Sequence, residues 1–300
     1  MRLPAWLSQH LAALRALLVL TVLTGILYPL VLTGVAQLPG LQHQADGSLA
    51  TVGDRTVGSA IIGQLFTDRD GNPLNQYFQT RPSAAGDGYD PTATAASNLG
   101  PESVVDTLPD PALIAAGHTD DNAKQSLLTQ VCSRSAAVGT LEGVDGSRPY
   151  CTADGVGAVL GVFHRDGITG PVTQVVSLNQ ACPATPFLAT YQGMPVECAK
   201  FGEDYSRGVV TPIRGEAPTH PAVPPDAVTA SGSGLDPAIS PQYAKLQAPR
   251  VAKTRGIPLD TVLTIVDQHT TGRALGFLGE PAVNVVELNT DLDQTYPFHG

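Results

Sequence analysis

The chain has 300 residues, of which 42% are hydrophobic and 15% are charged, and its formal net charge is −10 at pH 7. This length is sufficient for one or two domains with a buried core, and the acidic balance excludes the basic surface that nucleic acids require. The 31 glycines and 25 prolines predict a protein rich in loops.

The first predicted element is a membrane-spanning helix. No Asp, Glu, Lys or Arg occurs between Arg15 and Asp46, and a helix over residues 16–36 would be about 31 Å long, close to the hydrocarbon thickness of a bilayer. Arg2 and Arg15 precede this segment without any acidic residue, so we expect residues 1–15 in the cytoplasm and the remaining chain outside. A cleaved signal sequence is the alternative, although its apolar region is usually shorter.

Loops and one short apolar segment follow the membrane helix. Residues 41–54 form a predicted polar linker, and residues 57–66 a short strand or a turn packed on the core. Residues 77–101 are dense in Pro, Gly, Ser and Asn, which predicts a long ordered loop.

The middle of the chain combines a helix with strands. Apolar patterns predict a helix over residues 127–138 and strands over residues 158–164 and 173–178. Four prolines within residues 217–225 predict a stiff connector.

The C-terminal section is predicted to be mainly helical. A helix over residues 241–255 is interrupted by Pro249, and a second amphipathic helix begins at Pro258 and ends near Gly272. Residues 283–288 are predicted to form a strand. The expected fold class is α+β, with a single transmembrane helix followed by a mixed α/β domain outside the membrane.

All four cysteines lie in the middle section, at Cys132, Cys151, Cys182 and Cys198. In an oxidising compartment an even number of cysteines predicts two disulfides, for which three pairings are possible. A zinc site is the alternative, but no pair of cysteines has the C-x₂-C spacing of such a site.

A glycine- and serine-rich segment lies at residues 231–234. It does not match the G-x-S-x-G spacing of a serine hydrolase, and a nucleophilic Ser231 or Ser233 would need a histidine as base. We interpret the segment as a turn capped by Asp236 or Ser240, leading into the helix that starts at Pro241. An anchored hydrolase and a secreted binding domain remain the alternative functions.

Three arginines are expected to form structural ion pairs. Arg81, Arg250 and Arg273 can pair with Asp90, Asp236 or Glu280. For each of them ion pairing is favoured over binding of a substrate.

A series of short blocks resembles one protein family, the C subunit of the Kdp-type potassium-transporting ATPase. The blocks include Tyr77-Phe78-x-x-Arg81-Pro82-Ser83 and Ser97-Asn98-Leu99-Gly100-Pro101. In chain order they lie at residues 20–30, 58–66, 77–83, 89–91, 97–101, 228–237, 239–241, 250–252, 272–277 and 279–285. The resemblance covers roughly residues 15–101 and 226–292.

The resemblance implies a domain organisation. Residues 16–36 would be the transmembrane helix, and residues 37–101 together with 226–300 the extracytoplasmic core of the family. Residues 102–225, which contain all four cysteines, would be an inserted, disulfide-braced subdomain with a Pro-rich connector.

The resemblance also implies a non-catalytic accessory subunit of an ATP-driven potassium uptake complex. Its expected partners are a channel-like potassium-binding subunit, a P-type ATPase catalytic subunit, a small single-helix subunit and the lipid bilayer. No cofactor is implied for this chain, and ATP, magnesium and potassium are expected on the partner subunits.

Two groups of residues are candidates for structural or interface roles. Small residues that would allow close packing of the membrane helix on a partner helix are Thr24, Gly25, Thr33 and Gly34. The motif residues that the resemblance implies to be structural or at an interface are Arg81, Pro82, Asn98, Gly232, Ser233, Gly234, Asp236, Arg273, Glu280 and Asn284.

Overall fold

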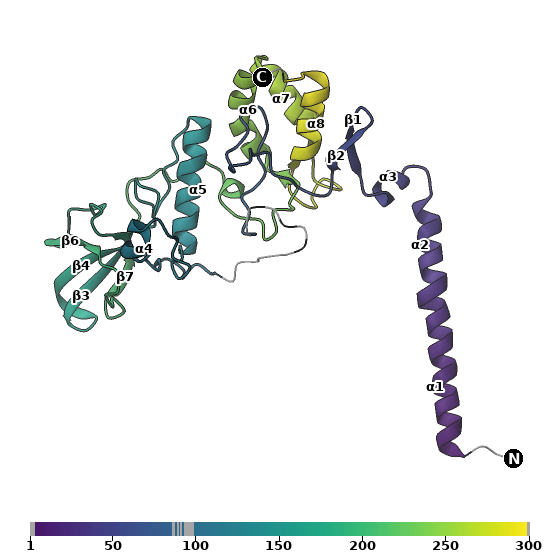
Figure 1. Ribbon diagram of the computed structural model, residues 1–300, viewed down its shortest axis with the longest axis horizontal. Helices are drawn as coiled ribbons and strands as arrows, with labels where there is room; N and C mark the ends of the chain where they lie inside the picture. Colours follow the sequence, from purple (N-terminus) through teal and green to yellow (C-terminus); the bar gives the residue numbers. More distant parts are fainter. Residues whose placement is uncertain (1–3, 86–87, 89, 91, 93–98, 299–300) are drawn as a thin grey trace. The chain divides into compact units, whose positions relative to one another are not determined.

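The computed structural model describes residues 4–85, 88, 90, 92 and 99–298, and it divides into two units, Met1–Ile61 and Ile62–Gly300. The first unit contains the predicted apolar helix (Figure 1). The helix consists of α1 (Ala5–Val22), a π-helical turn η1 (Leu23–Leu27) and α2 (Tyr28–Ala36). The predicted linker over residues 41–54 instead contains α3 (Gln42–Ala45) and β1 (Leu49–Val52), which pairs with β2 (Arg55–Ser59).

The middle section of the second unit contains a five-stranded sheet. Its helices are α4 (Pro111–Ala115) and α5 (Leu127–Glu142). The strands are β3 (Val159–Asp166), β4 (Thr169–Ala181), β5 (Thr190–Tyr191), β6 (Met194–Ala199) and β7 (Val209–Pro212). Their order is β5-β6-β4-β3-β7, and only the β4–β6 pair is parallel (Figure 1).

Both faces of the β3–β4 pair are buried. Val159 belongs to one apolar cluster, and Leu160, the next residue, belongs to another. Successive side chains of a strand point to opposite faces, so a continuous apolar run is needed to bury both. This explains why residues 158–164 are apolar at nearly every position.

The two disulfides predicted for the middle section are present. Cys132 of α5 is bonded to Cys151, and Cys182 is bonded to Cys198 at the end of β6. Each disulfide therefore joins two cysteines that are consecutive among the four, with separations of 19 and 16 residues. The first bridge ties α5 to the loop before the sheet, and the second ties the ends of the parallel strands β4 and β6 together.

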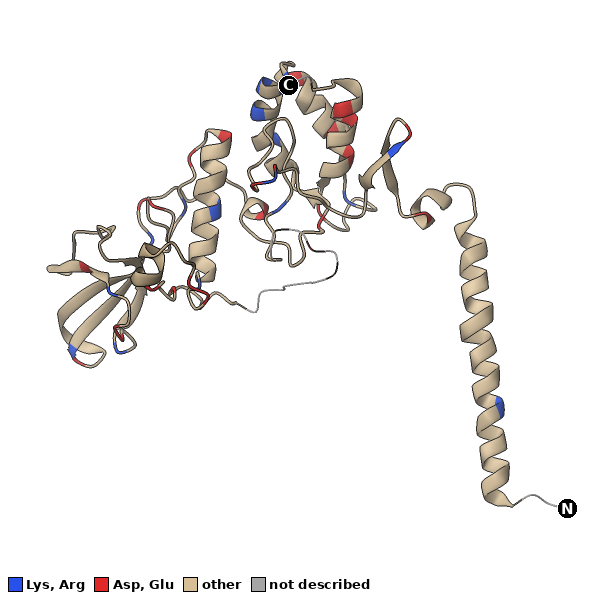
Figure 2. Ribbon diagram, viewed as in Figure 1, with Lys and Arg blue, Asp and Glu red and all other residues tan. Residues whose placement is uncertain are grey.

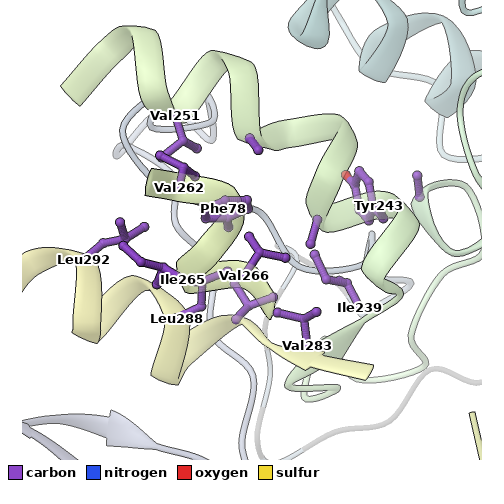
Figure 3. Close-up of a cluster of buried hydrophobic side chains, with 14 of the residues drawn as sticks. Phe78, Ile239, Tyr243, Val251, Val262, Ile265, Val266, Val283, Leu288 and Leu292 are labelled. Atoms are coloured by element: carbon purple, nitrogen blue, oxygen red, sulfur yellow. The ribbon is translucent and has the colours of Figure 1, made fainter. Parts of the chain in front are cut away.

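Three helices and a small sheet form the C-terminal section. The elements are η2 (Pro225–Ala227), β8 (Ala238–Ile239), α6 (Pro241–Arg255), α7 (Leu259–Gln268), β9 (Thr270–Thr271), β10 (Ala282–Asn284) and α8 (Val285–Thr295), with the strand order β8-β10-β9. Their apolar faces meet in the largest buried cluster, in which Phe78 lies among side chains of all three helices (Figure 3).

Residue types at the helix ends explain the boundaries of α5 and α6. The hydroxyls of Ser126 and Ser240 accept hydrogen bonds from the amides of Thr129 and Tyr243, at 3.1 and 3.0 Å. At the other end, Gly143 and Gly256 adopt the left-handed conformation in which glycine is favoured. Ser240 is thus one of the two caps that the sequence offered for this helix.

The C-terminal section corrects three expectations. The predicted strand over residues 283–288 ends at Asn284, because the Asn284 side chain accepts from the amide of Glu287 at 3.1 Å and starts α8 there. Pro249 does not interrupt α6. It lies on the exposed face of the helix, where water can solvate the backbone carbonyl one turn earlier, which the proline leaves without an N–H donor. Helix α7 ends at Gln268, before Gly272.

Candidate functional site

The N-terminal helix is the first candidate for a functional surface. It is continuous over Ala5–Ala36, an 18-residue stretch within it has a mean hydropathy of 2.2, and none of that stretch is buried among the described residues. By length and composition it can cross a membrane. The wide turn η1 ends two residues before Pro29, which has no N–H to donate within the helix.

The four small residues predicted to contact a partner helix lie on this exposed helix. The hydroxyls of Thr24 and Thr33 donate to the carbonyls of Leu20 and Pro29, at 2.7 and 2.9 Å. Gly25 and Gly34 leave open space where a side chain would stand, apart from one methyl group 3.9 Å from a Cβ built at Gly25. Close helix packing at these positions stays a prediction.

In the second unit, the loop at residues 229–236 joins segments that are distant in sequence. The amide of Ser231 donates to the carbonyl of Pro82 at 2.7 Å, and the Ser231 carbonyl accepts from Ala84 at 2.8 Å. The carbonyl of Leu235 accepts from the amide of Gly63 at 2.8 Å. Three family-motif blocks, at residues 58–66, 77–83 and 228–237, therefore meet through backbone hydrogen bonds.

Arg81 fixes both ends of this loop. Its Nη1 lies 2.8 Å from Oδ2 of Asp236, and its Nε and Nη2 donate to the carbonyl of Thr229 at 3.2 and 3.1 Å. The Arg81–Asp236 pair agrees with the ion pairing predicted from the sequence. Because the side chains are 27% and 45% exposed, the pair sets geometry more than it adds stability.

Gly234 is required by the close approach of two loops. Its φ is +73°, and a Cβ there would overlap the carbonyl oxygen of Gly88 and lie 2.9 Å from Oγ of Ser83. Gly232 and Ser233 lie half-buried in the same turn. Asn98 lies outside the described residues.

The serine hydroxyls of this turn are engaged with the backbone. Oγ of Ser231 accepts from the amide of Gly234 at 3.2 Å, and Oγ of Ser233 accepts from Leu235 at 3.3 Å. His269 instead hydrogen-bonds to Asp291 at 2.9 Å. In the described part of the chain these groups do not form the serine–histidine contact of a hydrolase, and no cluster of His, Cys, Asp and Glu is arranged for a metal ion.

The extended segment that follows Tyr77 is held by two buried side-chain amides. Asn289 of α8 accepts from the amide of Phe78 and donates to its carbonyl, both at 2.9 Å. Gln247 of α6 does the same for Gln79, at 2.7 and 3.1 Å. The segment is thus hydrogen-bonded to a helix on each side without belonging to a sheet.

Sequence reasoning missed both amides, although the helix pattern contains them. Gln247 lies in the buried series Ala244, Gln247, Ala248 and Val251, and Asn289 in the series Val285, Leu288, Asn289 and Leu292. Both series have the spacing of a buried helix face. A polar residue inside such a stripe predicts a buried hydrogen-bonding role.

Tyr77 is fixed by α6 and α8 together. Its hydroxyl donates to Asp293 at 2.9 Å, and the Arg255 guanidinium lies 5.1 Å from its ring centroid. Arg255 also pairs with Asp293 at 2.7 Å. Burial, with the Asp293 hydrogen bond, raises the pKa of the Tyr77 hydroxyl, which stays a donor at neutral pH.

Arg250 pairs with a residue that the sequence did not suggest. Its Nε lies 3.0 and 3.1 Å from the two carboxylate oxygens of Glu142, at the end of α5. The side chains are 8% and 1% exposed. This buried pair joins the Cys-bearing section to helix α6.

The remaining predicted pair lies at the base of an exposed loop. Nη2 of Arg273 is 2.7 Å from Oε2 of Glu280, and both side chains are largely exposed. The motif residues therefore mostly join loops, start helices and hold turns.

Comparisons with known proteins agree with this arrangement of motifs. A family model described as "K+-transporting ATPase, c chain" matches residues 10–125 and 206–294. Proteins named "Potassium-transporting ATPase KdpC subunit" from Kineococcus radiotolerans and Mycobacterium tuberculosis are both 36% identical, over 97% and 95% of this chain and 96% and 98% of their own lengths. A KdpC subunit from Caulobacter vibrioides is 32% identical over 97% of this chain and 95% of its own length.

These alignments cover nearly the whole chain, so the relatives also contain a counterpart of residues 126–205, which the family model leaves unmatched. The section with both disulfides is therefore shared with full-length relatives and is not peculiar to this sequence. On the family match and these identities, the chain belongs to the KdpC family, the c chain of potassium-transporting ATPases.

Proposed function

We propose that this chain is a non-catalytic accessory subunit that stabilises the potassium-transporting ATPase and caps the outer face of its channel-like subunit. The observation that carries the proposal is the N-terminal apolar helix, none of whose described residues is buried. One helix cannot enclose an ion path, so it needs lipid and partner helices around it.

The proposed orientation has the N-terminus in the cytoplasm and the second unit outside. Arg2 and Arg15 flank the N-terminal side of the helix, and the two disulfides are typical of an oxidising compartment. ATP and magnesium would then bind a partner on the cytoplasmic side. Potassium would bind the channel-like subunit.

Matched single-cysteine labelling tests this orientation. Asp70→Cys places a thiol on an exposed turn of the second unit, and Ser8→Cys places one on the exposed N-terminal end of α1. In intact cells a membrane-impermeant maleimide should label the first variant and leave the second unlabelled. Labelling in the reverse pattern would refute the orientation.

Deletion of the second unit tests the function. A chain that keeps residues 1–61 retains the whole first unit, with its helix, and loses the second unit. Cells that carry it in place of the full chain should lose potassium uptake at low external potassium, or lose assembly of the complex. Normal uptake with an assembled complex would contradict a capping and stabilising role. If the small single-helix subunit co-purifies with both forms of the chain, it binds the N-terminal helix alone.

A further inference from the structure

The loop between β9 and β10 forms a short hairpin, here called the apolar hairpin (residues 273–280). Ala274 and Leu278 exchange two backbone hydrogen bonds, at 2.8 and 2.9 Å, and the amide of Gly276 donates to the carbonyl of Arg273 at 3.1 Å. The Arg273–Glu280 ion pair, at 2.7 Å, closes the base. These contacts hold one conformation of a loop that packs on little else.

The tip of the apolar hairpin presents large side chains to solvent. Leu275 is 83% exposed, Phe277 is 68% exposed and Leu278 is 51% exposed. Leu275 also has a φ of +54°, a conformation that is rare for a leucine. Strained backbone and a group of exposed apolar side chains are both typical of contact sites.

The charge around the hairpin favours a protein over a lipid surface as its partner. Its two ionic groups neutralise each other, so it offers no positive charge to anionic headgroups. Helix α8, which follows strand β10 in the chain, has acidic residues on its surface (Figure 2). A membrane with anionic lipids would repel this part of the domain.

We propose that the apolar hairpin inserts Leu275 and Phe277 into an apolar pocket on another subunit of the ATPase. Apolar anchors that fill a pocket supply most of the affinity of an interface, and a rigid loop loses little entropy on binding. The hairpin lies within residues 206–294, which the family model matches. This inference rests on the proposed role as an accessory subunit.

Co-purification of the complex through a tag on the full-length chain tests the inference. Leu275→Ser/Phe277→Ser removes both anchors, and Ile168→Ser is a matched control, because Ile168 is 77% exposed at the turn between β3 and β4. In detergent, the double variant should recover at least tenfold less of the partner subunits, while Ile168→Ser recovers as much as the unchanged chain. Intact disulfides and an unchanged melting temperature would show that the variants are folded.

A photo-crosslinking variant, Leu275→p-benzoylphenylalanine, provides an independent measurement. It should crosslink to a subunit of the ATPase that mass spectrometry identifies. The proposal would be overturned if the double variant recovered as much of the partner subunits as the unchanged chain. It would also be overturned if the double variant lost only its binding to vesicles of anionic lipid. If even the unchanged chain recovers no partner subunit, the proposed function itself fails, which distinguishes the two results.

Discussion

Replacing Arg250 by methionine should cost much more stability than replacing its partner Glu142 by glutamine. Arg250→Met leaves a buried carboxyl group without its counter-charge, which costs about 3–5 kcal/mol. It also removes the donor to the carbonyls of Asn75 and Tyr77, at 2.7 and 3.0 Å. Glu142→Gln leaves Arg250 with these acceptors and with Oε1 of Gln247, so its cost is about 1–2 kcal/mol.

The pH dependence of Arg250→Met follows from the same burial. Burial raises the pKa of Glu142 above its ordinary value of 4.5, and the charge of Arg250 opposes this shift. A raised pKa means that the folded state holds the proton more tightly than the unfolded chain. The contribution of the protonated Glu142 to folding stability is therefore fully present below pH 4.5 and is lost as pH rises through the raised pKa.

Without Arg250 no opposing charge lowers the pKa of Glu142, so the loss of folding stability should extend to higher pH. The stability of Arg250→Met should therefore fall as pH rises from 4.5, relative to that of Glu142→Gln/Arg250→Met, in which the carboxyl group is absent. Tyr243 also lies near Glu142, but burial raises its pKa, so it stays neutral in this range.

Urea unfolding of the full-length chain in detergent, followed by far-ultraviolet circular dichroism, measures these differences. Tryptophan fluorescence would not report them, because the single tryptophan, Trp6, belongs to the N-terminal helix. Equal losses for Arg250→Met and Glu142→Gln would refute the reasoning. A pH profile of Arg250→Met parallel to that of the double variant would refute it as well.

Three further predictions concern the rest of the second unit. Cys132→Ser/Cys151→Ser opens a loop that spans 19 residues, which should cost about 3 kcal/mol and lower Tm by about 6–12 °C, measured by calorimetry against the unchanged, disulfide-bonded chain. Gly234→Ala adds a clash to a left-handed backbone and should cost about 2–4 kcal/mol, whereas Gly215→Ala, with φ +65° but open space, should cost about 1 kcal/mol. Asn289→Leu leaves both backbone groups of Phe78 without partners and should cost about 2–4 kcal/mol in urea unfolding; an unchanged midpoint would contradict that role.

Local signals in the sequence predicted several elements well. The apolar periodicity of residues 127–138 falls within α5, and Ser240 before Pro241 marks the start of α6. The N-terminal apolar helix was predicted from the absence of charge, which is visible without any knowledge of tertiary structure. In each case the residues that determine the element lie within it or beside it.

The predictions that failed depended on competing local signals or on distant contacts. Residues 283–288 are rich in valine, which suits a strand, but Asn284 and Glu287 have the spacing of a helix-capping pair. Glu142 could not be assigned to Arg250, because 108 residues separate them and either charge suits an exposed helix surface. Among the candidate residues, Arg81 pairs with Asp236, one of the three acidic partners that the sequence offered to the three arginines without choosing among them, while Gln247 was overlooked as an ordinary polar residue.

The hydrogen bonds of the segment after Tyr77 determine how this protein would respond to a broken chain. Phe78 and Gln79 are hydrogen-bonded to α8 and α6, and Pro82 to the loop of Ser231, so this early segment holds the C-terminal helices by contacts that do not depend on the chain between them. A protease cut within the exposed turn at residues 117–123 would therefore leave the helices attached. The two fragments should migrate separately in denaturing gels and together in native ones, so such a cut would leave the C-terminal helices attached to the N-terminal part of the chain.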